Sequence, residues 1–147
     1  MDDFSKKIES RFKEEFPEWA KYCSTVSPNG EPFLVIKIPR PNDIGKPDLE
    51  LETCNDEVTV FFGPYHIHCD DFGDNDAYDD ALLFVKQIVS EQSVIVSYWH
   101  KDSWCGSNLV KVVDIPKDNT EYPYADTIKI YSWTGKQDVH IDCCPKA

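Results

Sequence analysis

The chain has 147 residues, a formal net charge of −12 and a sequence pI near 4.6. This length suits one domain with a hydrophobic core, and a hydrophobic content of 41% is too high for an intrinsically disordered chain. The negative charge would repel nucleic-acid phosphates and anionic membranes, which argues against binding to DNA, RNA or a lipid surface. The same charge would attract a basic protein, although acidity also serves solubility alone.

The first seven residues include four charged side chains and lack the apolar stretch of a signal peptide. No segment approaches the ~20 apolar residues that a membrane span requires. We therefore expect a cytoplasmic protein with reduced cysteines. The six cysteines are Cys23, Cys54, Cys69, Cys105, Cys143 and Cys144. None of them shows the Cys-x2-Cys spacing that is typical of structural zinc sites.

The N-terminal half predicts one helix followed by strands. Phe4, Ile8, Phe12 and Phe16 recur every four residues among charged side chains, which predicts an amphipathic helix that Asp2 or Asp3 caps and Pro17 ends. A turn signal with Asn-Gly at its centre spans 27–32. Strands are expected at 33–38, 49–54 and 58–62, with a tight turn at 55–57 between the last two.

The C-terminal half predicts a second helix and further strands. Residues 76–90 carry a broad apolar face, and the aspartates before them can cap a helix there. We expect strands at 94–99 and 109–113, separated by a loop, and a terminal hairpin of 127–133 and 137–141. The order of helices and strands predicts a single α+β domain, 1–147, in which both helices pack on a mainly antiparallel sheet.

Two histidines follow the strand at 58–62. His66 and His68 are two residues apart, so they share one face if the strand continues. Imidazole together with an aspartate oxygen suits zinc or iron, but the sequence identifies neither His100 nor His140 as a third ligand. The alternative is a pair of structural histidines at the end of a strand, and we expect no bound metal.

The region after these histidines is strongly acidic. Its aspartates are Asp70, Asp71, Asp74, Asp76, Asp79 and Asp80. Their spacing does not match a calcium-binding EF-hand loop. Helix capping needs only one or two of them. The others either serve solvation or form a site for a basic partner.

Cys105 lies between Trp104 and Gly106-Ser107, a setting that could suit a thiol nucleophile activated by a nearby histidine. Its likeness to the cysteine motif of papain-like proteases is superficial, because here the cysteine precedes Gly-Ser and no second cysteine follows. The alternative is a loop at 101–108 that surrounds an exposed or half-buried Trp104.

A small, acidic, aromatic-rich α+β chain with no catalytic motif resembles the bacterial immunity proteins of polymorphic toxin and contact-dependent inhibition systems. The segments 65–71 and 99–106 contribute to this resemblance of type. It implies a cytoplasmic protein without a cofactor that binds and neutralises a cognate, basic toxin domain such as a nuclease. The expected docking residues are Asp70, Asp71, Asp74, Asp76, Tyr78, Asp79, Trp99 and Trp104. The alternatives are a small metal-dependent or thiol hydrolase that uses His66, His68 and Cys105, and an adaptor module.

Overall fold

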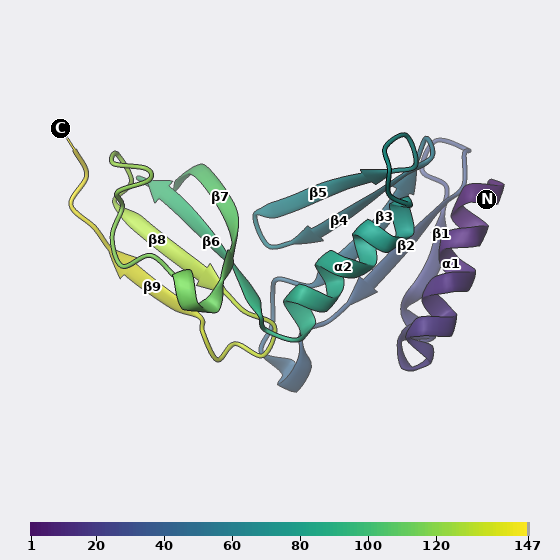
Figure 1. Ribbon diagram of the computed structural model, residues 1–147, viewed down its shortest axis with the longest axis horizontal. Coiled ribbons are helices and arrows are strands. Elements are labelled where there is room, and N and C mark those ends of the chain that lie inside the picture. Colours follow the sequence, from purple (N-terminus) through teal and green to yellow (C-terminus); the bar gives the residue numbers. More distant parts are fainter. Residues whose placement is uncertain (147) are drawn as a thin grey trace. The chain divides into compact units, whose positions relative to one another are not determined.

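The structure, a computed structural model, describes residues 1–146, and these divide into two compact units (Figure 1). Unit 1 comprises Met1–Pro39, Asp48–Phe62 and His66–Val85. Unit 2 comprises Arg40–Pro47, Gly63–Tyr65 and the chain from Lys86 onward. The expected α+β fold is confirmed, and its antiparallel strands form two sheets.

The sheet of unit 1 is a meander in which each strand neighbours the next along the chain. Its strands are β1 (Cys23–Val26), β2 (Phe33–Ile38), β3 (Leu49–Cys54), β4 (Glu57–Phe62) and β5 (Tyr65–Asp70). The turn expected between β3 and β4 is present, and Asn55 and Asp56 both adopt positive φ, 50° and 61°. Two successive positive φ angles suit a tight turn between twisted strands. The sequence indicated β2, β3 and β4 but not the short strand β1.

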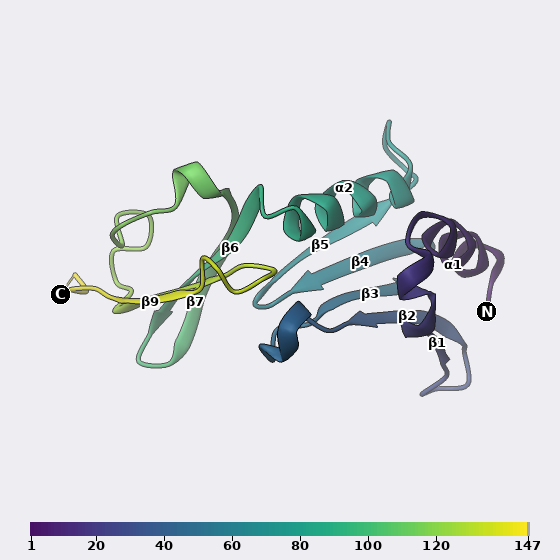
Figure 2. The same cartoon turned by 90° about the horizontal axis from the view of Figure 1, so that it is seen from below.

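Two helices lie on the same face of this sheet, α1 (Asp3–Glu15) and α2 (Ala77–Val89) (Figure 2). The N-cap is Asp2, whose side chain accepts a hydrogen bond from the Ser5 backbone N–H at 2.7 Å. Ile8 and Phe12 of α1 are buried, and a 3-10 helix, η1 (Pro17–Tyr22), follows at the expected proline. These apolar side chains and the core-facing side of the sheet therefore form the core of unit 1.

The opposite face of the unit 1 sheet carries neither α1 nor α2. Because side chains alternate along a strand, every second residue of β2 to β5 points to that face. In β3, for example, Leu49, Leu51 and Thr53 are buried, whereas Glu50 and Glu52 are half-buried. We call this side the open face. Its side chains include Val35, Lys37, Glu50, Glu52, Glu57, Thr59, Phe61, His66 and His68.

The sheet of unit 2 has the strand order β7-β6-β8-β9. Its strands are β6 (Ser93–His100), β7 (Ser103–Lys111), β8 (Thr127–Tyr131) and β9 (Val139–Asp142). Short 3-10 helices occur at η2 (Pro41–Asp43) and η3 (Val112–Asp114). One face packs around Val96, Tyr98, Ile128 and Ile130, with Tyr122 against them.

The prediction of a loop at 101–108 is wrong, because β7 already begins at Ser103. Lys101 and Asp102 have φ values of 47° and 64°, so two residues suffice to turn the chain between β6 and β7. Gly106, which suggested a loop, is buried in the strand beneath the ring of Tyr122. A glycine in a strand often marks such a close approach.

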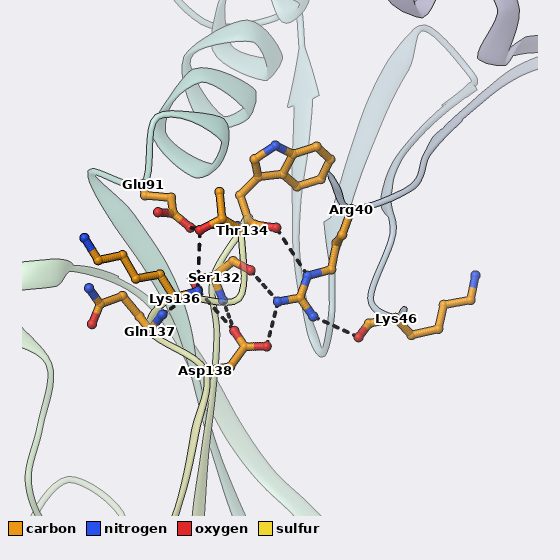
Figure 3. A network of polar contacts seen from close by, with 9 residues as sticks. Arg40, Lys46, Glu91, Ser132, Thr134, Lys136, Gln137 and Asp138 are labelled. Carbon is orange, nitrogen blue, oxygen red and sulfur yellow. Dashed lines mark hydrogen bonds and ion pairs between the residues drawn. The ribbon is translucent and has the colours of Figure 1, made fainter. Parts of the chain in front are cut away.

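A buried arginine organises one end of unit 2 (Figure 3). Arg40 is 5% exposed and donates hydrogen bonds to the backbone oxygens of Lys46, Ser132 and Trp133. It also pairs with Asp138, which itself accepts hydrogen bonds from the N–H and the hydroxyl of Ser132. The guanidinium therefore joins the 40–47 segment to the connection between β8 and β9.

None of the helices within residues 1–146 combines the length and the apolar character needed to cross a membrane.

Candidate functional site

The acidic loop, residues 70–76, begins at the last residue of β5 and leads into α2 in unit 1. Asp70 accepts a hydrogen bond from the backbone N–H of Phe72 at 3.1 Å, and Asp71 accepts one from Ala77 at 2.7 Å. Such local contacts from aspartate side chains to the backbone stabilise turns and helix starts. Asp74 is exposed at the surface of the loop. Two of the predicted docking carboxylates thus also hold the loop in shape.

Asp76 and Asp79 are largely satisfied within unit 1. Asp76 accepts hydrogen bonds from the backbone N–H groups of Tyr78 and Asp79, which is the role of an N-cap. Its carboxylate lies 2.7 Å from Arg11 and 3.4 Å from Lys7 of α1, and Asp79 lies 2.7 Å from the same Arg11. Partial burial would raise the pKa of Asp76, but the Asp79 N–H and the Arg11 guanidinium outweigh it and lower the pKa.

Tyr78, the tyrosine expected at the docking surface, belongs to the core of unit 1. It is 4% exposed, and burial raises its pKa to about 12. Its hydroxyl donates to the backbone oxygen of Arg11, and the Arg11 guanidinium lies 4.1 Å from the centre of its ring. An interface anchor has to reach the partner, and the buried ring of Tyr78 does not.

Phe72 is the residue that the sequence patterns missed. Its side chain is 86% exposed in the middle of the acidic loop, next to Asp71 and two residues before Asp74. Isolated exposed apolar residues are common on protein surfaces. An exposed phenylalanine surrounded by carboxylates, however, matches the usual make-up of an interface, in which an aromatic residue at the centre is bordered by charged ones. The sequence did contain a sign that Phe72 is exposed. The residue fits the apolar periodicity of neither β5 nor α2, and a glycine follows it.

The two predicted tryptophans belong to unit 2, where they are cross-strand partners on β6 and β7. The indole N–H of Trp99 donates to Ser97 and that of Trp104 to Ser107, at 2.8 and 2.7 Å. Trp104 is 56% exposed, whereas Trp99 is half-buried beneath the ammonium of Lys129. Trp99 also lines a shallow, mainly apolar pocket of about 310 Å³ together with Lys46, Pro47, Gly63, Pro64 and Tyr131.

The two histidines of the hydrolase alternative lie together on the open face. The rings of His66 and His68 meet edge to face with centroids 5.0 Å apart. His68 Nδ1 lies 2.5 Å from Glu57 Oε1 and 3.2 Å from the hydroxyl of Thr59. In the part of the chain that the structure describes, no three histidine, cysteine or acidic side chains are grouped so that they could hold a metal ion.

The other groups named for that alternative lie elsewhere. Cys105 is an exposed residue of β7 in unit 2, whereas His66 and His68 belong to unit 1, and its thiol contacts the backbone oxygen of Ser103. Of the histidines considered as a third ligand, His100 bonds the backbone oxygen of Tyr124 at 2.7 Å, and His140 lies 3.4 Å from Asp142.

Comparison of the chain with protein-family models, with curated proteins and with solved structures finds no match.

Proposed function

We propose that the chain is an immunity-type protein of the cytoplasm that binds and neutralises a basic toxin domain, such as a nuclease, through its acidic loop. The observation that carries this proposal is Phe72, which is 86% exposed between Asp71 and Asp74. A few aromatic anchors surrounded by polar residues typically supply most of the free energy of a protein interface. Phe72 is such an anchor, and the aspartates around it form the charged rim.

The loop also has the order that tight binding requires. The hydrogen bonds of Asp70 to Phe72 and of Asp71 to Ala77 fix the backbone before a partner arrives. An ordered loop loses less conformational entropy on binding than a flexible one. The capping of α2 by Asp76 and its ion pair with Arg11 hold the end of the loop in place.

The negative charge of the chain supports the proposal of a basic partner. The whole chain carries −12. Opposite charges on two proteins steer their encounter and raise the association rate. A nuclease domain is basic where it meets phosphates, so a loop of carboxylates competes for the same surface. Trp104, which is exposed in unit 2, is a second candidate anchor.

The test measures binding between this chain and the product of the neighbouring gene by surface plasmon resonance. We expect Phe72→Ala to weaken binding by at least 2 kcal/mol, about 30-fold, as the loss of an interface hot spot does. Asp74→Asn should mainly slow association, and the slowing should shrink as salt shortens the Debye length from ~10 Å at 0.1 M to ~3 Å at 1 M. Leu83→Ala, which removes an exposed apolar side chain from α2, is the matched control.

Wild-type protein that does not bind this product would refute the immunity function. Binding that is equally tight for the wild type, Phe72→Ala and Asp74→Asn would place the interface away from the acidic loop. Circular dichroism and a thermal melt of each variant establish that it is folded, and we expect Phe72→Ala to melt like the wild type because its ring lies in solvent.

A further inference from the structure

The open face of unit 1 brings two glutamates and an aromatic ring together. Glu52 stands opposite Val35 on β2 and Thr59 on β4, and Glu50 stands opposite Lys37 and Phe61. Directly opposed residues of an antiparallel pair have Cβ atoms about 5 Å apart, so these side chains touch their neighbours. Glu50, Glu52 and Phe61 therefore form a contiguous patch at the centre of this face.

The two glutamates differ in their partners. Glu50 forms an ion pair with Lys37 at 3.4 Å. Glu52 takes part in no ion pair among residues 1–146, although it is half-buried. Partial burial raises the pKa of Glu52, and the hydrogen bond and the negative charge of Glu50 raise it further, whereas the positive charge of Lys37 lowers it without cancelling the rise. A half-buried carboxylate beside another carboxylate costs free energy in the isolated protein, and a cation from outside would relieve that cost.

The aromatic member of the patch is Phe61. Its ring is half-buried and leans against His66, with centroids 5.4 Å apart. The face of an aromatic ring attracts a cation, and arginine is the cation that most often uses it. The planar guanidinium group also donates two parallel hydrogen bonds to carboxylates, which the ammonium group of lysine cannot do.

We propose that the open face of unit 1 binds an arginine side chain of a basic partner protein, with Glu52 and Glu50 accepting its hydrogen bonds and Phe61 stacking on its guanidinium. This site rests on the proposed function only in taking the partner to be basic. Lys37 remains with Glu50, so Glu52 supplies the larger part of the attraction. The site is distinct from the acidic loop, whose Asp76 and Asp79 already bind Arg11.

The experiment uses ¹⁵N NMR titration of the full chain with the capped peptide acetyl-Gly-Arg-Gly-Arg-Gly-amide at constant ionic strength. We expect saturable shifts of β3 and β4 amides, and tighter binding than for the same peptide with lysine in place of arginine. Glu52→Gln should weaken binding to this face at least 10-fold. Glu18→Gln removes the same charge from an exposed position in η1 and should leave the binding unchanged.

Two further variants test the geometry. Phe61→Leu keeps an apolar side chain but should reduce the preference for arginine over lysine. Glu52→Asp keeps the charge and shortens the side chain, so it should weaken binding less than Glu52→Gln does. If the Glu52→Gln variant does not fold, Glu52→Asp is measured in its place.

The proposed site would be refuted if Glu52→Gln and Glu18→Gln lost the same amount of peptide affinity. It would also be refuted if the peptide shifted only amide signals of the acidic loop. Because the titration does not use the product of the neighbouring gene, a failure here differs from a failure of the immunity function.

Discussion

Arg40 and Asp138 form an ion pair in unit 2, with 2.6 Å between Arg40 Nη2 and Asp138 Oδ2 (Figure 3). The Arg40 side chain is 2% exposed, and that of Asp138 is 34% exposed. The same guanidinium donates to three backbone oxygens, those of Lys46, Ser132 and Trp133. A buried arginine with this many protein acceptors has a structural role, because few of its donors remain for a ligand.

Arg40→Met should destabilise the protein by about 2–3 kcal/mol, because breaking a buried ion pair costs roughly 3–5 kcal/mol and the partial exposure of Asp138 reduces this. The loss also leaves the three backbone oxygens without their donor. Arg40→Lys should recover only part of the stability, since an ammonium group cannot span the same acceptors. Urea denaturation measures both changes.

The control for Arg40→Met is Lys117→Met, which removes an exposed positive charge from the same unit. If Arg40→Met lowers the free energy of unfolding no more than Lys117→Met does, the hydrogen bonds and ion pair of Arg40 contribute little to stability.

Gly106→Ala should destabilise unit 2, because the added Cβ would lie 2.5 Å from the hydroxyl oxygen of Tyr122 and 2.6 Å from two of its ring carbons. The ring of Tyr122 packs against that of Tyr98, with centroids 4.5 Å apart, so a shift would disturb the core. Overpacking of this kind costs typically 1–3 kcal/mol. Gly73→Ala is the matched control, because its Cβ would meet nothing within 4 Å, and thermal melts should separate the two variants by several degrees.

Glu52→Gln should raise the melting temperature at pH 7. Partial burial and the neighbouring Glu50 raise the pKa of Glu52 in the folded protein, so folding favours the protonated form. Stability from this group is present below the pKa of the unfolded chain, near 4.3, and is lost as the pH rises through the folded value. Glutamine carries no charge, so the Glu52→Gln variant does not lose this stability as the pH rises.

The gain from Glu52→Gln should therefore shrink as the pH falls from 7 to 4, and melts across that range measure it. An equal gain at both pH values would assign the effect to packing instead of charge. Increased stability together with reduced arginine binding would show that the open face keeps this carboxylate at the expense of stability.

The cysteines should react with a thiol reagent in two groups at pH 8. Cys54, Cys105 and Cys144 are exposed and should react first. Cys69 is buried, and burial raises its pKa to about 11, so little thiolate is present at that pH. Burial also raises the pKa of Cys23 and Cys143. Denatured protein should give six thiols in total, and four or fewer would indicate disulfides and contradict the expected cytoplasmic location.

The sequence by itself determined much of the local structure, although it missed β1 and the start of β7. The four-residue recurrence of Phe4, Ile8 and Phe12 predicted α1, and the alternating residues 49–54 predicted β3. These elements were predictable because helix and strand periodicities depend on which side chains must leave water. The α+β class followed from their order, and the turn at Asn55 and Asp56 from residues that tolerate positive φ.

Only the tertiary structure decided which of the predicted site residues reach solvent. Tyr78 and Phe72 are both aromatic residues among aspartates, yet the helical phase of α2 buries Tyr78 and the loop exposes Phe72. Asp76 and Asp79 looked like surface charges until α1 brought Arg11, more than sixty residues earlier in the chain, to within 2.7 Å of each. The pairing of strands likewise placed Glu52 beside Thr59 on the open face. Sequence patterns report local preferences, whereas exposure and ion pairing depend on contacts between distant segments, which form only when the chain packs.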